Sequence, residues 1–254
     1  MNQIAKRKFR STQVASIEDL TPHLKRFVLS GNDLHDFPEG QDGVHVKAIF
    51  LADGSPVTDH NKQDAIKRSY TIREFDSLNK RLTLDFVVNR HQGPATNWAQ
   101  NAKVGDYLGI GGPGERKLTN FTANSYLLIG DITAVNAVNG YAKFIPPEAA
   151  LTAIVTVPTA DDIIEMDAGD HLNVLWHVED EDQESLLDVV NKNALNMAKN
   201  TQVFIGLEAR QLREVKSLLL HDLNFDRLNM HATGYWKKGM DADRFGADKK
   251  RNPL

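Results

Sequence analysis

The chain of 254 residues contains no cysteine. This absence excludes disulfides, thiolate nucleophiles and cysteine-ligated iron–sulfur clusters, so any electron transfer must use an organic cofactor or a metal without thiolate ligands. Lys and Arg number 30 against 34 Asp and Glu, so there is no surplus of positive charge of the kind that marks nucleic-acid binding. We therefore expect no nucleic-acid partner.

The sequence also lacks an apolar run long enough to cross a bilayer,. Lys6, Arg7, Lys8 and Arg10 could begin a signal sequence, but no apolar segment of sufficient length follows them,. A solvated start of a strand is the simpler interpretation of these charges. We expect an untargeted protein of the cytoplasm that does not span a membrane.

Two further patterns are missing. The nine histidines show no spacing typical of metal ligands,, so we expect no metal bound by the protein itself. A Gly-x-Gly-x-x-Gly run, the fingerprint of many dinucleotide-binding turns, is also absent,. Gly130 and Gly206 each follow an apolar run that is typical of a buried strand. Without the fingerprint, such a glycine indicates either a nucleotide site or a simple tight turn.

The hydrophobic pattern changes near residue 120. Before it, short alternating segments separated by turn residues predict six strands of a small antiparallel barrel, with one helix near residues 93–102. The predicted strands cover residues 12–17, 24–29, 45–51, 70–75, 82–88 and 107–110.

After residue 120, continuous apolar runs alternate with helical patterns, which predicts strands buried on both faces in a parallel sheet. The runs cover residues 126–129, 151–157, 172–178, 203–207 and 229–233, and the helices residues 135–145, 185–198 and 208–219. The predicted fold is a two-domain β plus α/β protein. Residues 1–121 form the six-stranded antiparallel β-barrel, and residues 122–254 form an open parallel-sheet domain.

The strongest chemical signal begins at Arg68. Because side chains in a strand alternate, Arg68, Tyr70 and Ile72 share one face, which places a guanidinium beside an aromatic ring. Farther along, Gly93 and Pro94 are typical of a helix start, whose free N–H groups and dipole attract anions. These features suit a ligand with a flat aromatic part and a phosphate part, such as a flavin dinucleotide.

Seven motifs follow one another along nearly the whole chain: Arg68-Ser69-Tyr70-Thr71, Asp85-Phe86-Val87-Val88, Gly93-Pro94-Ala95-Thr96-Asn97-Trp98-Ala99, Gly105-Asp106, Gly112-Pro113-Gly114, Gly130-Asp131-Ile132-Thr133-Ala134 and Gly234-Tyr235-Trp236-Lys237-Lys238-Gly239. In this order they resemble the siderophore-interacting proteins, flavin-dependent ferric-siderophore reductases of the ferredoxin-reductase-like group. Two positions depart from that pattern. Asn89-Arg90 stands where the family usually has His-Gly, and His177-Val178-Glu179 stands where an Arg often follows the central Trp.

The resemblance implies FAD in the barrel and NADH or NADPH in the α/β domain. Arg68 would pair with the flavin pyrophosphate, Tyr70 would lie against the isoalloxazine ring, and Thr71 would bond the flavin edge through its backbone. The full set of implied cofactor contacts is Arg68, Ser69, Tyr70, Thr71, Val87, Val88, Asn89, Gly93, Pro94, Ala95, Thr96, Asp131, Thr133, Ala134, Tyr235 and Trp236. Each has a simpler interpretation, such as a surface ion pair, a barrel tyrosine, an ordinary helix start or aromatic packing.

The implied substrate is a ferric siderophore, whose hard oxygen donors hold Fe(III) more tightly than Fe(II). A hydride donor gives two electrons and iron accepts one, so flavin is a suitable carrier between them. No catalytic acid, base or nucleophile is required. Cations next to elements implied to bind flavin would attract an anionic chelate, although a single lysine is more often a solvated surface charge. These cations are Lys47, Arg116, Lys117, Lys237 and Lys238.

Other functions remain open at this point. The chain could be a flavin reductase whose acceptor is not iron, a siderophore-binding carrier without turnover or, with less support, a nucleotide-binding regulatory protein. The electron donor could also be a protein instead of NADH or NADPH.

Overall fold

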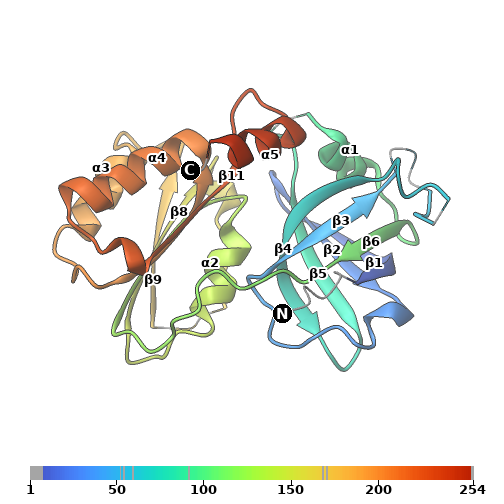
Figure 1. The fold of residues 1–254 in the computed structure, drawn as a ribbon, viewed down its shortest axis with the longest axis horizontal. Coiled ribbons are helices and arrows are strands. Elements are labelled where there is room, and N and C mark those ends of the chain that lie inside the picture. The colour runs from blue at the N-terminus through green and yellow to red at the C-terminus, as the bar shows by residue number, and fades with distance from the viewer. Residues whose placement is uncertain are drawn as a thin grey trace. The chain divides into compact units, whose positions relative to one another are not determined.

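The computed structural model describes residues 8–51, 53, 55–58, 60–90, 92–167, 169 and 171–252. Lys6 and Arg7, interpreted above as part of a solvated strand start, lie outside these residues. The chain divides into two compact units, Met1–Arg116 and Lys117–Leu254, which are drawn in blue to green and in green to red in Figure 1. Each unit is described separately.

Unit 1 is a closed barrel with the strand order β1-β2-β5-β4-β3-β6. Every neighbouring pair is antiparallel, and β1 pairs with β6 to close the barrel. The predicted six-stranded antiparallel barrel is therefore confirmed. Its elements are β1 (Phe9–Thr21), β2 (Leu24–Ser30), a 3-10 turn η1 (Asn32–Leu34), β3 (His45–Phe50), β4 (Ile66–Asp76), β5 (Arg81–Val87), α1 (Pro94–Asn101) and β6 (Tyr107–Gly111).

An aromatic cluster attaches α1 to the barrel. The Trp98 ring of α1 lies 5.1 Å from the ring of Phe27, 5.3 Å from Phe86 and 5.9 Å from Phe50, measured between centroids. All four side chains are buried. Burial of one such side chain stabilises a fold by about 1.5–3 kcal/mol, so Trp98 holds the helix start at a defined place on unit 1.

Unit 2 contains a five-stranded parallel sheet with the order β11-β10-β7-β8-β9. The predicted parallel-sheet domain is confirmed. Its elements are β7 (Ser125–Asp131), α2 (Val135–Ala142), β8 (Ala150–Val157), η2 (Ala160–Asp162), β9 (Leu172–Val178), α3 (Leu186–Ala194), β10 (Gln202–Glu208), α4 (Ala209–Ser217), a π-helical turn η3 (Leu218–Asp222), η4 (Arg227–Asn229), β11 (Met230–Trp236) and α5 (Ala242–Arg251).

Helices cover both faces of this sheet (Figure 1). Leu127 and Ile129 of β7 pack in the same cluster as Leu212 and Val215 of α4. Gly130, which points to the opposite face, lies against α2. The strand order reverses between β7 and β10, and ligands of open α/β sheets bind beyond the carboxyl ends of the strands at such a point.

Two helices differ from the expectations. The helix expected over residues 185–198 ends at Ala194. Helix α5 (Ala242–Arg251) was not expected, because Phe245 is its only buried residue and the rest of its pattern is polar. A start signal was nevertheless present, since Asp241 caps α5 by accepting hydrogen bonds from the N–H groups of Asp243 and Arg244,.

The described residues include neither a candidate membrane span nor a candidate metal cluster. No helix among them has the length and apolarity needed to cross a membrane. No group of three or more His, Asp or Glu side chains in the same part of the chain is arranged to hold a metal ion.

Candidate functional site

In unit 1, Arg68 and Tyr70 lie on the same face of β4. Their cross-strand partners on β3, Ala48 and Val46, are buried in the barrel core, while Arg68 and Tyr70 are only half-buried. The Tyr70 ring stacks on Phe86, with centroids 3.8 Å apart and an angle of 27° between the planes. Burial raises the pKa of the Tyr70 hydroxyl, and the positive charge of Arg68 acts in the opposite direction. Arg68 and Tyr70 therefore share one face, as the alternation of the strand predicts, and Nη1 of Arg68 donates to the carbonyl oxygen of Lys67 at 2.9 Å.

Ser69 and Thr71 point to the other face of β4. The Nζ atom of Lys47 donates a hydrogen bond to Oγ of Ser69 at 2.6 Å, so a predicted substrate residue and a predicted cofactor residue meet here. Thr71 is buried and pairs with His45 of β3. This face therefore holds two hydroxyl groups together with Lys47 and Lys67.

The start of α1 has the geometry expected of an anion site. Gly93 is extended at the N-cap position, Pro94 is the first helical residue, and no side chain caps this end. Ala95 and Thr96 in the first turn are buried. Because the first N–H groups of a helix have no partner within the helix and Pro94 has no N–H, this turn suits a phosphate oxygen.

The end of β5 leads into Asn89, which has a positive φ of 60°. Its Nδ2 donates to the carbonyl oxygen of Pro22 at 2.8 Å, and its Oδ1 accepts from Nε2 of Gln100 at 3.0 Å. The adjacent Val88 N–H donates to the carbonyl oxygen of His23 at 3.0 Å, and Val87 pairs with Leu24. The side chain of Asn89 thus connects β5 to the β1–β2 turn and to α1.

In unit 2, Asp131 ends β7 and is 4% exposed. Its Oδ1 accepts hydrogen bonds from N and Oγ1 of Thr133, at 2.8 and 2.5 Å. Its Oδ2 accepts from N of Glu208 at 3.1 Å and from Nε1 of Trp236 at 2.8 Å. Burial raises the pKa of Asp131, the bonds from Thr133 and Trp236 oppose that shift, and the charge of Glu179 adds to it. The predicted residues Asp131, Thr133 and Trp236 are therefore brought together.

Gly130 and Gly206 are paired in register on neighbouring strands. A Cβ atom on Gly206 would lie 2.8 Å from both Cβ of Ala134 and Cε2 of Tyr235, and one on Gly130 would lie 3.3 Å from Cβ of Ala134. The predicted residues Ala134 and Tyr235 thus fill the space above the two glycines. Close packing within the chain accounts for both glycines without a ligand.

Glu208 was missed from the sequence. It is buried at the end of β10, where its Oε2 accepts hydrogen bonds from the N–H groups of Arg210 and Gln211 at the start of α4. Its Oε1 accepts from N of Lys238 at 3.1 Å. An acidic residue between an apolar run and a helical pattern is the local signal of such a cap, but its contact with Lys238 is visible only in the structure.

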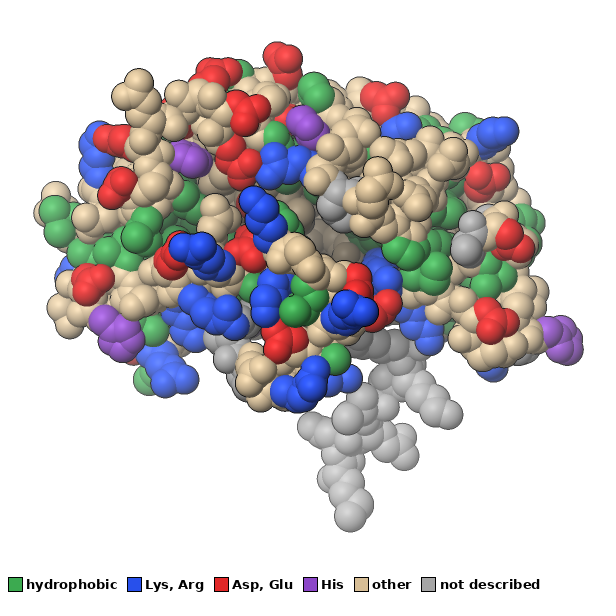
Figure 2. Space-filling model, turned by 90° about the horizontal axis from the view of Figure 1, so that it is seen from above, with side chains coloured by type: hydrophobic (Ala, Val, Ile, Leu, Met, Phe, Trp, Pro, Cys, Tyr) green, Lys and Arg blue, Asp and Glu red, His purple; other side chains and the backbone are tan. Residues whose placement is uncertain are grey.

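Of the five predicted substrate cations, Lys47, Arg116 and Lys237 have hydrogen-bond or ion-pair partners, and the other two are exposed. Arg116 donates to the carbonyl oxygens of Gly40 and Asp42, and Nζ of Lys237 lies 2.9 Å from Oδ2 of Asp248. Lys117 and Lys238 are exposed. On the face drawn in Figure 2, Lys and Arg side chains are interspersed with Asp and Glu.

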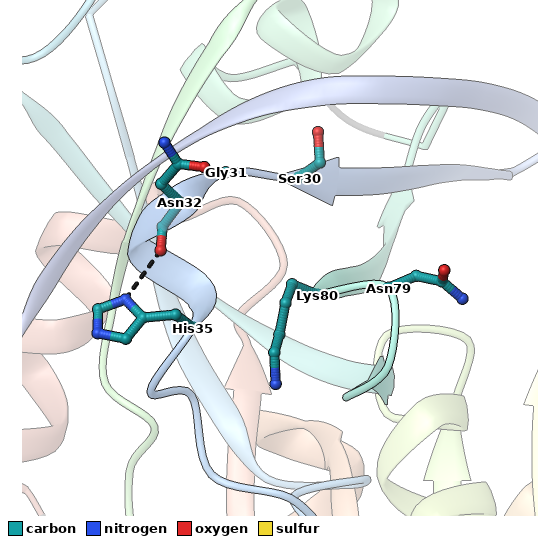
Figure 3. Close-up of a pocket in the computed structure, with 6 residues that line it drawn as sticks. All are labelled: Ser30, Gly31, Asn32, His35, Asn79 and Lys80. Carbon is teal, nitrogen blue, oxygen red and sulfur yellow. Dashed lines mark hydrogen bonds between the residues drawn. The ribbon is translucent and has the colours of Figure 1, made fainter.

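A surface hollow of about 710 Å³ lies elsewhere in unit 1 (Figure 3). It is lined by Ser30, Gly31, Asn32, His35, Asn79 and Lys80. None of these residues was predicted to bind cofactor or substrate. His35 contacts the backbone of Asn32, with 2.9 Å between Nδ1 and the carbonyl oxygen.

A closed antiparallel barrel followed by a parallel α/β unit is the ferredoxin-reductase-like fold. The ferredoxin reductase of carbazole 1,9a-dioxygenase shares this fold, with a TM-score of 0.69 over 91% of this chain and 67% of that chain at 16% identity. Among proteins with this fold, the family model described as "Siderophore-interacting FAD-binding domain" matches residues 13–117, and the one described as "Siderophore-interacting protein" matches residues 123–239. The chain belongs to the siderophore-interacting protein family.

Two relatives extend over nearly the whole chain. Ferric vibriobactin reductase ViuB of Vibrio cholerae is 25% identical over 243 residues, which cover 91% of this chain and 90% of ViuB. The crystal structure of the siderophore-interacting protein SipS from Aeromonas hydrophila has a TM-score of 0.82 and 28% identity, and covers 97% of this chain and 98% of SipS. The resemblance inferred from the ordered motifs is confirmed.

Proposed function

We propose that this protein is an FAD-dependent reductase that converts the Fe(III) of a ferric siderophore to Fe(II) and so releases iron in the cytoplasm. Its electrons come from NADH or NADPH, or from a protein donor. The observation that carries the proposal is the arrangement in unit 1, where Arg68, Tyr70 and the uncapped start of α1 lie within a match to a siderophore-interacting FAD-binding domain. ViuB, a relative over nearly the whole chain, bears the name of a ferric-siderophore reductase.

The residues of unit 1 fit a flavin dinucleotide. The planar guanidinium of Arg68 offers paired donors to phosphate oxygens, and the first turn of α1 offers backbone N–H groups. One face of Tyr70 is supported by Phe86, which leaves the opposite face for a flat ring. Bound FAD would accept a hydride and pass electrons on one at a time.

The chain's own residues position and orient the reactants. Reduction of the chelated iron transfers electrons only, so no side chain has to act as an acid, a base or a nucleophile. We assign flavin binding to residues 1–121 and nicotinamide binding to residues 122–254.

Among the cations, Lys117 and Lys238 are the strongest candidates to attract an anionic chelate because they are exposed, with Lys47 as a third. Arg116 and Lys237 already have backbone or carboxylate partners.

A single anaerobic assay separates this function from its alternatives. Purified protein supplied with FAD should be yellow, and NADH or NADPH plus a ferric siderophore should yield Fe(II) that a ferrous chelator traps. Reduction of a dye but not of any ferric chelate would favour a flavin reductase with another acceptor. Protein that takes up no flavin yet binds a ferric siderophore would be a carrier, and both reductase functions would then be excluded.

A further inference from the structure

The end of β11 departs from a regular strand at Tyr235. The register with β10 runs from Leu207 opposite Gly234 to Glu208 opposite Trp236, so that Tyr235 is an extra residue. Such a bulge changes the direction of the side chains that follow it. The result here is that Trp236 reaches Asp131 of β7, although β10 lies between β7 and β11 in the sheet.

We propose that Asp131 is a positioning residue that fixes the ring of Trp236, and that it is not itself a cofactor ligand. An ionised carboxylate has about four acceptor positions, and the four hydrogen bonds from Thr133, Glu208 and Trp236 occupy them. No acceptor is left for the amide or hydroxyl groups of a nucleotide. A buried carboxylate would also repel the phosphates of that nucleotide.

The indole of Trp236 has one hydrogen-bond donor, and it is given to Asp131. Because β11 is an edge strand, its ladder with β10 holds it on one side only. The bond to Asp131 therefore supplies an orientation that the sheet does not. Trp236 remains half-buried, so part of its surface is available for contact.

The residues before and after Trp236 are also fixed by hydrogen bonds or ion pairs. Nζ of Lys249 in α5 donates to the carbonyl oxygen of Gly234 at 3.0 Å, and the Lys237–Asp248 pair joins the same helix to the residue after Trp236. The N–H of Lys238 donates to Glu208. The neighbours of Trp236 on both sides in the chain are therefore fixed, and its indole N–H is bound to Asp131. A ring placed in this way suits a surface that orients a nicotinamide, which is the role that the proposed function requires of this end of the sheet.

A double-mutant cycle tests the inference, which rests on the proposed function for its kinetic part. Asp131→Asn and Trp236→Phe should each lower kcat/KM for NADH by roughly 10- to 100-fold, because the first removes the charge from the bond between residue 131 and the indole N–H and the second removes its donor. Since both act on the same bond, the double variant should be about as impaired as the worse single variant. FAD content should stay at the wild-type level in all three.

The matched control is Thr201→Val. Thr201 is a buried residue just before β10, at the amino edge of the sheet, and its Oγ1 donates to Oγ of Ser125 at the start of β7 at 3.0 Å. Its kcat/KM for NADH should equal that of the wild type. Independent, multiplicative losses in the Asp131 and Trp236 cycle would overturn the inference, as would a loss in Thr201→Val equal to that in Asp131→Asn.

The same variants can also be compared without any turnover, by their free energies of unfolding and their indole emission. Coupling between the two substitutions in urea unfolding, together with a changed indole emission in Asp131→Asn, should appear even in a protein that oxidises no NADH. That outcome would reject the proposed function and keep the positioning role, whereas additive unfolding free energies would reject the positioning role. If Asp131→Asn does not fold, Trp236→Phe is compared with the wild type alone: it keeps an aromatic ring without the indole N–H, and an unchanged kcat/KM for NADH would overturn the inference.

Discussion

Arg68 is half-buried on β4, and its positive charge opposes the rise in the pKa of Tyr70 that burial causes. In the proposed function it binds the flavin pyrophosphate, and a charge-assisted hydrogen bond of this kind contributes about 1.5–3 kcal/mol. We therefore expect Arg68→Ala to weaken FAD binding by roughly 10- to 150-fold. Titration of the flavin-free protein with FAD, followed by flavin fluorescence, measures the change.

Arg81→Ala is the matched control, since Arg81 is an exposed arginine at the start of the neighbouring strand β5. It removes the same charge from the same barrel and should leave FAD affinity unchanged. Wild-type FAD affinity in Arg68→Ala would assign Arg68 a structural role and would leave the start of α1 as the remaining candidate for the phosphate.

Local patterns could predict some of these residues and not others. The shared face of Arg68 and Tyr70 follows from the period of a strand, and Gly93-Pro94 indicates a helix start by itself. The bond of Asn89 to Pro22 and that of Asp131 to Trp236 have no local signal, because they join residues 67 and 105 positions apart. Asn89 has a positive φ, a conformation that Asn adopts more readily than most residues,.

At the scale of elements, the strand β9 ends in an acidic segment. Residues 179–184 contain five carboxylates: Glu179, Asp180, Glu181, Asp182 and Glu184. The N–H of Glu179 donates to the carbonyl oxygen of Val157, at the end of β8, and the charge of Glu179 raises the pKa of Asp131. Negative charge is therefore concentrated at the carboxyl edge of the sheet, where nicotinamide dinucleotides bind in related folds.

This charge leads to a prediction about the electron donor. The 2′-phosphate of NADPH needs a cation nearby, so we expect a weak preference for either dinucleotide or a preference for NADH. Glu179→Arg should raise kcat/KM for NADPH relative to NADH by about 10-fold, which corresponds to about 1.4 kcal/mol. Steady-state kinetics with both donors measures the ratio.

Glu148→Arg is the control for that change, because Glu148 is exposed and precedes β8 at the amino edge of the same sheet. It adds the same charge away from the proposed dinucleotide site and should leave the ratio as it is. A strong NADPH preference in the wild-type protein would contradict the prediction, and Arg210 and Arg213 would then be the residues to replace.

The elements themselves were predictable to the extent that they are amphipathic or buried. The barrel strands and the parallel sheet show clear periods, so their number and type are correct. Helix α5 has a single buried residue and is attached through Lys237–Asp248 and Lys249–Gly234. Polar attachments of this kind leave no hydrophobic period in the sequence, and the bulge at Tyr235 leaves none either.

For the whole molecule, the net charge of −4 repels an anionic ferric chelate at long range, so local cations have to attract it. Replacing both Lys117 and Lys238 by Ala should raise the KM for an anionic ferric siderophore about 3- to 10-fold at low ionic strength, and less as salt screens the charges. FAD content and the rate with a neutral acceptor should be unchanged. Initial rates at several salt concentrations measure the effect.

The control for net charge is the double variant Lys192→Ala and Lys199→Ala, which removes two exposed lysines on and just after α3. An equal rise in KM there would show that total charge, and not a local site, governs the encounter. No rise in the Lys117 and Lys238 variant would remove both residues from the substrate site and leave Lys47 to be tested.

The closure of the barrel by its first and last strands has a consequence for synthesis on the ribosome. Thr12 of β1 bonds to Leu108 of β6 across 96 positions, which takes roughly 5 to 20 s to translate at about 5–20 residues per second. During that interval β2 can pair with β1 on one side while the other edge of β1 stays open. Such an edge is prone to pairing with other chains, and this exposure lasts until residue 111 has left the exit tunnel.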